Sequence, residues 1–484
     1  MKIAIYTFLL LLAQPLFAQH AYMAHQPLFR EVPFQDTTTK LMIHKQLSYS
    51  ILFSEGDSVY STHNQKWGVA KRSHDMIVAM PTTSDRCATL AVSHECNDSS
   101  AILGDGGSIS IIPISYKFGN WSVSDSIKNI DFTTVGGTYN NCSGTYIKDK
   151  HTILTAEEGT PENNTVLYKN GRGYTDTSDI NGLKRFNNTG WMVEVDPASN
   201  QALHKLYKMG RFVHESALVM DDGKTVFLTD DFAPSVFFKF VASEKFNFQD
   251  GQLYAYKEAT ASDTSHWITL PMEMDSLIDI RNVALRMGAS YFIRLEWMTQ
   301  VGTKIYITAT GYDHFTIENV YKGKPAVHLL PYLRDNVIDQ PYGSVLEFDL
   351  LTNSIRVLIN GGSGIKQTDK HFSNPDAITS VVKNGKRYLI IQEDIIANTR
   401  GRVGPIALQH NMFINEIYCL DLSIKNPKVD DLKRLAIAPS GSETTGGTFI
   451  NRNARYYLIN IQHPDRTNPP PFNKSCTVVI DLNK

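Results

Sequence analysis

A cysteine and several acidic residues stand at the ends of short apolar segments, where side chains of these types can bind metal ions. Cys142 opens one such segment, which continues through a polar turn at 148–150 and a second apolar run to Glu157 and Glu158. Carboxylate oxygens suit hard cations such as Ca²⁺, and a thiolate among carboxylates suits a transition metal such as iron. This spacing predicts a mixed metal cluster. The plainer interpretation of Cys142 is an unpaired buried thiol.

The same order of polar residue, apolar run, turn, apolar run and acid recurs along the chain. It returns clearly at 214–231 and 374–394, more weakly at 294–308 and 443–464, and the run at 88–95 supplies the end of a sixth copy. The residues that open the copies lie 67 to 81 positions apart. The side chains collected in this way are Glu95, Cys142, Glu157, Glu158, Glu215, Asp230, Asp231, Arg294, Glu296, Asp376, Glu393, Asp394, Glu443 and His463.

These side chains are expected to converge if each copy is a β-hairpin. In an antiparallel hairpin, the start of the first strand and the end of the second strand lie at the same end. Six hairpins around one axis would bring all of their polar ends to one mouth. So many carboxylates cannot stay ionised together in a partly buried funnel without cations, and metal ions are therefore expected there. The alternative is that the acids are solvated residues at the ends of loops.

Arg294 is the basic residue of this set whose position suggests a role in binding a substrate. It lies two residues before Glu296, so on a strand both side chains would point to the same face. Its guanidinium group could hold an oxyanion through two parallel hydrogen bonds, or it could pair with a neighbouring acid. The sequence leaves both interpretations open.

The elements that must carry these residues are short strands separated by turn residues, with almost no helical periodicity. Four of the copies are followed by a further strand candidate that ends in Asp, at 193–196, 346–349, 418–421 and 478–481, so each sheet would have about four strands. Repeated antiparallel sheets predict an all-β fold, a six-bladed β-propeller with long insertions, and residues 19–484 are expected to form one domain. A two-sheet sandwich or two separate β-domains is the alternative.

The first 18 residues are typical of a secretory signal peptide. Lys2 precedes an apolar stretch from Ile3 to Ala13, and the small residue Ala18 stands where cleavage is expected. No twin arginine precedes the apolar stretch, which favours export of the unfolded chain by the Sec route. No later apolar stretch reaches the roughly 18 residues of a membrane-spanning helix. The mature chain is therefore expected to be secreted or periplasmic and to load metal after translocation.

The charge balance gives no reason to expect a nucleic acid or an anionic membrane as a partner. The chain has 47 Lys and Arg against 49 Asp and Glu, a formal net charge of −2, whereas both partners require clustered basic residues. Common catalytic motifs are also missing. The dipeptides at His94 and His214 lack the second His of a His-Glu-x-x-His zinc site, and no Gly-x-Ser-x-Gly elbow of a serine hydrolase occurs.

An odd number of cysteines in an exported chain leaves at least one thiol unpaired. The five are Cys87, Cys96, Cys142, Cys419 and Cys476. Pairing of the first two and of the last two is plausible. We therefore expect Cys142 to lie outside any disulfide.

Taken in order, these stretches resemble the PhoX-type alkaline phosphatases, a family of secreted bacterial proteins. The stretches read GTYNNCSG at 137–144, TAEE at 155–158, GRFVHE at 210–215, TDD at 229–231, RLE at 294–296, NPD at 374–376, ETTG at 443–446 and NIQHP at 460–464. The resemblance implies a six-bladed propeller that carries iron and calcium at its mouth and hydrolyses phosphate monoesters.

The resemblance also implies roles for individual residues. It implies phosphate binding by Arg294 and an Fe³⁺ and Ca²⁺ cluster whose ligands are Cys142, Glu158, Glu215, Asp231, Glu296, Asp376 and Glu443. The chain departs from the family in three places. The segment between Cys142 and Glu157 lacks the tryptophans often found there, Asp230 stands where Glu is common, and the twin-arginine signal is missing. The first two departures bear on substrate contacts and the third on export.

The predicted function is therefore that of a metal-dependent phosphomonoesterase, a monomer that acts on small phosphate esters. The ions would polarise phosphoryl oxygens, and Arg294 would offset the charge that develops on them. Two rivals remain, a calcium-dependent lactonase-like propeller hydrolase and a non-catalytic surface propeller whose ions only brace its channel. Cys142 favours the phosphatase, because calcium alone would not select a thiolate.

Overall fold

The computed structural model describes residues 29–35, 38–82, 84–169, 178–259, 264, 266–318, 320–362, 370–395, 414–450 and 454–483. Strands dominate these residues, as the predicted all-β class requires. The α-helices in the described residues are α2 (Asn164–Lys169), α3 (Met274–Ile278) and α4 (Ile280–Met287). None of the helices in the described ranges is long and apolar enough to cross a membrane. The predicted signal peptide, residues 1–18, lies outside the described residues.

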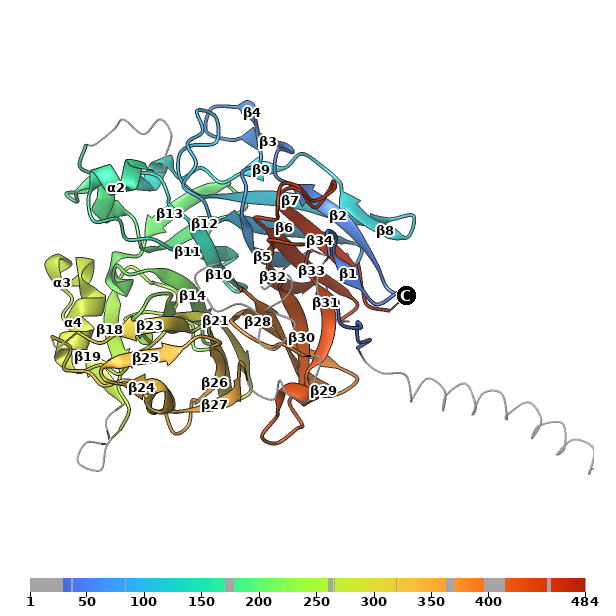
Figure 1. Ribbon diagram of the computed structural model, residues 1–484. Helices are drawn as coiled ribbons and strands as arrows, with labels where there is room; N and C mark the ends of the chain where they lie inside the picture. The colour runs from blue at the N-terminus through green and yellow to red at the C-terminus, as the bar shows by residue number, and fades with distance from the viewer. Residues whose placement is uncertain are drawn as a thin grey trace, which may run out of the picture.

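Six sheets of four or more strands follow one another along the chain (Figure 1). Sheet 1 comprises β5 (His74–Pro81), β6 (Cys87–His94), β7 (Ser108–Lys117), β9 (Lys128–Asn129), β3 (Ser58–Ser61) and β4 (Lys66–Val69), with β8 (Asn120–Val123) beside β7. Sheet 2 comprises β10 (Asn141–Ile147), β11 (Thr152–Glu157), β12 (Met192–Asp196) and β13 (Gln201–Lys205). Sheet 3 comprises β14 (His214–Val219), β15 (Thr225–Asp230), β17 (Phe238–Ala242), β18 (Gly251–Tyr256) and β19 (Trp267–Thr269).

The second half of the chain forms the other three sheets. Sheet 4 comprises β21 (Leu295–Val301), β22 (Lys304–Ala309), β26 (Ser344–Asp349) and β27 (Ser354–Asn360). Sheet 5 comprises β28 (Pro375–Lys383), β29 (Lys386–Glu393), β30 (Glu416–Asp421), β31 (Lys433–Ile437) and β1 (Met42–Ile43). Sheet 6 comprises β32 (Glu443–Ile450), β33 (Tyr456–Gln462), β34 (Cys476–Asp481) and β2 (Ser48–Ser54). Two small sheets join β16 (Ser235–Val236) to β20 (Tyr291–Phe292), and β23 (Tyr312–Thr316) and β24 (Leu333–Arg334) to β25 (Val337–Gln340).

The strand given first for each sheet above lies near a common centre; these first strands are β5, β10, β14, β21, β28 and β32. Each of them contacts the first strand of the next sheet, and β32 of sheet 6 contacts β5 of sheet 1. In Figure 1 these first strands surround the middle of the molecule, and the later strands of each sheet lie further out. Strand β2, the second strand of the chain, pairs with the last strand, β34. An early strand therefore completes the sheet that the end of the chain forms.

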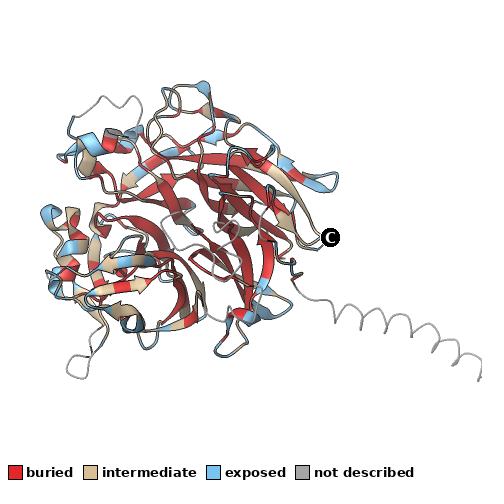
Figure 2. Cartoon of the chain, in the orientation of Figure 1, coloured by how far each residue is buried: buried red, intermediate tan, exposed pale blue. Residues whose placement is uncertain are grey.

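Strands close to the centre are buried on both faces, because neighbouring sheets cover them (Figure 2). Every residue of β11 and of β33 is buried, including their polar ones. Between sheets 2 and 3 the core contains the fully buried side chains of Trp191, Phe212 and Phe238. The four strands predicted to end in Asp are present as β12, β26, β30 and β34, the third strand of their sheets.

Candidate metal centre

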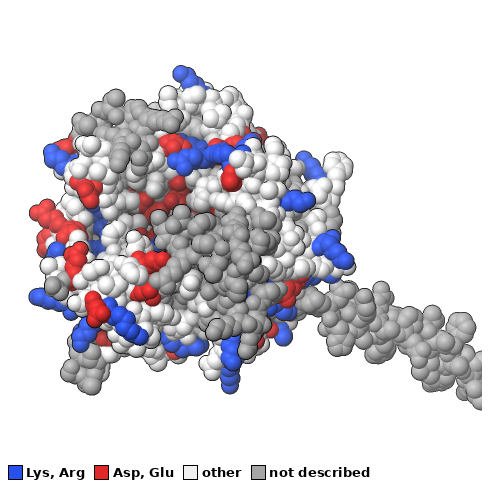
Figure 3. Space-filling model, in the orientation of Figure 1, with Lys and Arg blue, Asp and Glu red and all other residues white. Residues whose placement is uncertain are grey.

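The acidic ends of the hairpins surround one cavity of about 450 Å³. Acidic side chains gather in a hollow near the centre of the face shown in Figure 3. The titratable residues that line the cavity include nine carboxylates and two thiols, with Arg72, Arg294 and His463 as the basic groups. The acids are Asp75, Glu95, Glu158, Glu215, Asp231, Glu296, Asp376, Asp394 and Glu443, and the thiols are Cys96 and Cys142. The predicted ligand residues and Arg294 therefore all line the same cavity.

A β-bulge near the start of the first strand positions one cavity residue in five of the six sheets. In each of these sheets, the first pair of facing residues in the hairpin is followed by a register shift. Two residues of the first strand there stand opposite one residue of the second strand. A bulge bends the strand and re-aims its side chains. The residues placed at these bulges are Asp75, Cys142, Glu215, Glu296 and Asp376.

Hydrogen bonds from the preceding sheet hold four of these bulges in place. In each, a side chain on a second strand donates to the backbone carbonyl oxygen of the bulge residue. The donors and acceptors are Ser93 and Cys142, Thr229 and Glu296, Thr308 and Asp376, and Asn460 and Asp75. The last bond joins sheet 6 to sheet 1. Neighbouring sheets thus fix the position of each other's cavity residues.

Three second strands end in a pair of acidic residues, and only the second member of each pair lines the cavity. The pairs are Glu157-Glu158, Asp230-Asp231 and Glu393-Asp394. Successive side chains on a strand point to opposite faces, so the first member of each pair must lie elsewhere. The prediction that all six acids reach the mouth is therefore wrong for the first members.

Those first members are buried against partners within the sheets. Lys205 Nζ lies 2.8 Å and 3.0 Å from the two carboxylate oxygens of Glu157. Arg281 forms a two-bond fork with Asp230, with N–O distances of 2.8 and 2.5 Å. Glu393 accepts hydrogen bonds from two backbone N–H groups. These three acids brace the structure and are not candidate ligands.

Lys205→Met tests the structural role of Glu157. The substitution leaves a buried carboxylate without its cation, so we expect the free energy of unfolding to fall by about 3–5 kcal/mol. Chemical denaturation of the variant and the wild type measures this difference. Lys184→Met is the matched control, because Lys184 pairs with Asp179 at 3.0 Å with both side chains largely exposed, and such pairs contribute little. Equal effects of the two substitutions would contradict the assignment.

Arg294 is held between acids of the cavity. Its Nε and Nη2 atoms lie 2.8 and 3.1 Å from the two oxygens of Asp231, and Nη2 lies 3.0 Å from Glu296 Oε1. The residue precedes β21 and has φ +48°, so its contact with Glu296 comes from a left-handed turn rather than from strand alternation. Burial acts to lower the pKa of Arg294, but Asp231 and Glu296 outweigh it and raise that pKa. The ion pair, one of the two interpretations left open by the sequence, is present.

Sheet 6 contributes to the cavity in a different way. Its bulge holds Gly446 and Gly447, and Gly446 has φ +87°, where a Cβ atom would lie 2.8 Å from the Ile77 side chain. Its cavity residues, Glu443 and His463, lie further toward the ends of the strands, with His463 Nε2 3.1 Å from Glu443 Oε2. The sixth sheet therefore supplies its ligand candidates from beyond the bulge.

Burial and mutual repulsion favour the neutral forms of these carboxyl groups. Burial raises the pKa of Glu215 well above its usual value, and the neighbouring carboxylate of Glu296 adds to the effect. The same causes raise the pKa of Asp75 to about 7, where burial is the largest cause and the Glu95 carboxylate is the next. Burial, again the largest cause, raises the pKa of the carboxyl groups of Glu158, Glu296, Asp376 and Glu443 and of the Cys142 thiol well above their usual values. Most of these acids are buried, so the alternative of solvated loop ends is wrong.

Asp75 is the cavity acid that the sequence analysis missed. The second strand of its hairpin was recognised from the run that ends at Glu95, but the first strand, which starts at His74, was not. A signal was available, because His74-Asp75 opens its strand in the same way as His214-Glu215 does. Other cavity residues not singled out are Arg72, Ser73, Cys96, Asn97, Asn140 and Gln462.

All five cysteines are free, so the expectation that Cys142 lies outside any disulfide is confirmed. The pairing considered for Cys87 and Cys96 is not formed. Strand β6 begins at Cys87 and runs to His94, and at about 3.3 Å per residue it separates the two thiols far beyond the reach of a disulfide. Cys419 and Cys476 lie in one apolar core between different sheets and are also unpaired.

The donor atoms in the cavity are grouped closely enough to hold metal ions. Among the described residues there are four groups of three side chains in which each side chain offers one ligand atom, and the three atoms lie within 4.8 Å of one another. The groups are Asp75 with Glu95 and Cys142, Cys142 with Glu158 and Glu215, Glu215 with Glu296 and Asp376, and Asp394 with Glu443 and His463. Buried oxygens of Asn140, Asp376, Asp394 and Gln462 accept no hydrogen bond, and buried acceptors of this kind require a partner. The donor set therefore fits cations.

The fold and the cavity define a β-protein with an acidic site suited to cations. Comparison with known families is more specific, since the PhoX alkaline phosphatase family matches residues 118–465. The chain therefore belongs to the PhoX alkaline phosphatase family. The family acts as a phosphoric monoester hydrolase, which agrees with the predicted activity. A search of curated proteins found no match.

Several solved structures resemble the chain at low identity. The sialidase of Trypanosoma rangeli matches at 10% identity and a TM-score of 0.39, over 91% of this chain and 59% of that chain. A carbohydrate-active enzyme of family AA12 from Trichoderma reesei matches at 11% identity and a TM-score of 0.42, over 93% and 100%. The WD40 β-propeller domain of Doa1 matches at 10% identity and a TM-score of 0.36, over 89% and 96%. At these scores the three structures say nothing about the function of this chain.

Proposed function

We propose that the chain is a secreted phosphomonoesterase that hydrolyses small phosphate esters with Fe³⁺ and Ca²⁺ bound in the acidic cavity. Membership of the PhoX alkaline phosphatase family supports the reaction. The observation that carries the metal requirement is the gathering of nine carboxylates and the Cys142 thiol on one cavity of about 450 Å³, with the Cys96 thiol also on its wall. Carboxylates without cations would repel each other and a phosphate dianion alike.

The proposed ligands all line the acidic cavity, and all of them except Asp231 belong to the close groups of donor atoms. They are Cys142, Glu158, Glu215, Asp231, Glu296, Asp376 and Glu443, with Asp75 as a further candidate. Asp231 uses both oxygens on Arg294, but each oxygen retains a second lone pair. Cys142 supports iron, because its thiolate is a softer ligand than calcium selects.

The chain's own residues would bind and orient the ester. Asp231 holds the Arg294 guanidinium in a fixed fork, so that its remaining N–H groups can donate to phosphoryl oxygens as charge develops on them. Glu296, 3.0 Å from Arg294, keeps that guanidinium beside the proposed ligands. When bound, the ions would supply Lewis acidity toward the phosphoryl oxygens.

We also propose that the six sheets are the blades of a six-bladed propeller and that residues 19–484 form one domain. The ring of contacts between first strands and the Asn460 bond to the Asp75 carbonyl support this arrangement. Residues 1–18 would be a Sec-type signal peptide that directs the chain to the periplasm or the medium, where a monomer would act. The proposal rests on the apolar stretch from Ile3 to Ala13.

Elemental analysis tests the proposed metal content. Protein purified without added metal is expected to contain both iron and calcium, and the iron should give a visible thiolate-to-metal absorption band. Cys142→Ser should remove that band, because an alcohol oxygen replaces the sulfur ligand. Cys419→Ser is the control, since Cys419 lies in an apolar core away from the cavity. Active protein that is colourless and free of both metals would overturn the proposal.

A further inference from the structure

Lys71 is a buried lysine whose ammonium group meets backbone carbonyl oxygens. The residue precedes β5 and is 6% exposed. Its Nζ atom lies 2.7 Å from the carbonyl oxygens of Gly104 and Gly106, 3.1 Å from that of Gly107 and 3.3 Å from that of Asp98. Four oxygens from a single segment, 98–107, thus point at one nitrogen.

This geometry requires the protonated form of the side chain. Carbonyl oxygens can only accept hydrogen bonds, and an ammonium group offers three donors. A neutral amine would have two donors and a lone pair facing an oxygen. Burial lowers the pKa of Lys71 below its ordinary value, and the Cys96 thiol and the Asp105 and Asp98 carboxyls reduce that shift without reversing it.

The segment is shaped around the ammonium group. Gly104 and Gly106 have φ +84° and +83°, a left-handed backbone that only glycine adopts readily. The Gly106 N–H donates to the Asp98 carbonyl oxygen at 3.0 Å, and Arg72 forms a fork with the Asp98 carboxylate. The tight turns direct several carbonyl dipoles inward, as in sites that replace the hydration shell of a monovalent cation.

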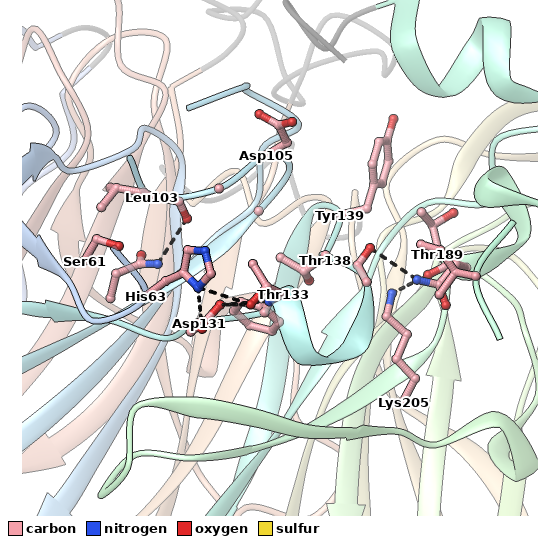
Figure 4. A pocket seen from close by; sticks show the side chains of 18 of the residues that line it. Ser61, His63, Leu103, Asp105, Asp131, Thr133, Thr138, Tyr139, Thr189 and Lys205 are labelled. Atoms are coloured by element: carbon pink, nitrogen blue, oxygen red, sulfur yellow. Dashed lines mark hydrogen bonds and ion pairs between the residues drawn. The ribbon is translucent and has the colours of Figure 1, made fainter. Parts of the chain in front are cut away.

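The same segment adjoins two cavities. Cys96 and Asn97, just before it, line the acidic cavity. Leu103 and Asp105 line a second cavity of about 490 Å³, and Figure 4 shows them across that cavity from Lys205. The segment therefore forms part of the wall of the second cavity and directly follows two residues of the acidic cavity.

We infer that the four carbonyl oxygens form a site for a monovalent ammonium-type cation, which the chain fills with its own Lys71, and that this internal cation fixes the segment that adjoins the two cavities. Lys71 is a positioning residue, because it does not line the acidic cavity itself and its ammonium group binds the backbone of segment 98–107. A truncated side chain should leave a site that a small alkylammonium ion can occupy.

Chemical rescue of Lys71→Ala tests the inference. We expect the melting temperature to fall by roughly 5 °C, because four buried carbonyl oxygens lose their donor. Amide exchange in 98–107 should become at least roughly tenfold faster. Ethylammonium chloride should restore at least half of both changes. Tetramethylammonium chloride at the same ionic strength should restore neither, because it carries the charge without an N–H donor.

Two further variants control the experiment. Lys71→Met fills the space without hydrogen-bond donors, so its melting temperature and amide exchange should change as in Lys71→Ala, and neither salt should restore them. If Lys71→Ala does not fold, Lys71→Met alone tests whether the ammonium group is required. Lys66→Ala removes an exposed lysine nearby and should change neither measurement. Wild-type behaviour of Lys71→Met, or equal rescue by the two salts, would overturn the inference. Neither readout uses ester hydrolysis or bound metal, so its failure leaves the proposed function intact.

Discussion

Protein stripped of metal by a chelator is expected to lose stability as the pH rises from about 4 to about 7 and beyond. Burial raises the pKa of Asp75 from 3.8 to about 7. The folded state therefore holds its proton more tightly than the unfolded state does, and the stability present below pH 4 is lost as the pH rises through the folded value. For this one group the loss is on the order of 4 kcal/mol. Burial shifts the pKa of Glu215 and Glu296 in the same direction, so these groups should add to the decline.

Urea denaturation of metal-free and metal-loaded protein at pH 5 and pH 8 measures this effect. The metal-loaded protein should show little of the decline, because bound cations stabilise the ionised carboxylates. Asp75→Asn should flatten the decline of the metal-free protein between pH 4 and 7, since the amide does not titrate there. Equal stability of the metal-free protein at the two pH values would show that the acids are compensated without metal.

Much of the site could be predicted because each hairpin is a local structure. An apolar run, a turn and a second apolar run identify two adjacent antiparallel strands, and a hairpin brings its own ends together. Cys142, Glu215, Glu296 and Asp376 were therefore assigned to one place, and all four stand at bulges on the cavity. The bulge itself has no clear signature in a single sequence.

The choice between adjacent acids could not be made from local patterns. Whether Glu157 or Glu158 faces the cavity depends on Lys205, which lies 48 residues from Glu157 in the sequence. Asp230 depends in the same way on Arg281, 51 residues away. Such partners become visible only when the sheets are assembled, because side-chain alternation gives two opposite faces without saying which is inner.

The joining of the chain ends was also beyond a local analysis. Strand β2 carries no acidic anchor and pairs with β34, more than 400 positions later. The hairpin of sheet 1 was half recognised for a related reason. Its first strand, which starts at His74, is followed by the sequence TTSDR at 82–86, which contains no glycine, and glycine is the strongest signal of a tight turn.

Replacement of Arg294 by Ala is expected to lower kcat/KM for an aryl phosphate by about 10²-fold or more. That is the effect of losing one preorganised donor to the charge of the transition state. Arg294 lies 2.8 Å from Asp231 and 3.0 Å from Glu296, so its removal also leaves two acids without a counter-charge. The Ala variant should therefore melt at a lower temperature as well.

Arg294→Lys separates the two contributions of this side chain. Lysine keeps the positive charge beside Asp231 but cannot form the two-bond fork. We expect metal content and melting temperature close to wild type, with activity still reduced by at least roughly tenfold. Arg281→Lys is the matched control, because Arg281 forms the same kind of fork with Asp230 but does not line the cavity. It should retain nearly full activity.

Glu296→Ala should give the opposite combination of effects, because Glu296 is proposed as a ligand. Loss of a carboxylate leaves a cation under-coordinated, so metal occupancy, stability and activity should fall together. Arg294→Lys should reduce activity alone. If Arg294→Lys keeps full activity while its metals are bound, phosphate is held elsewhere in the cavity. If metal-loaded wild type hydrolyses no phosphate ester, the acidic cavity binds its ions for a purpose other than this catalysis.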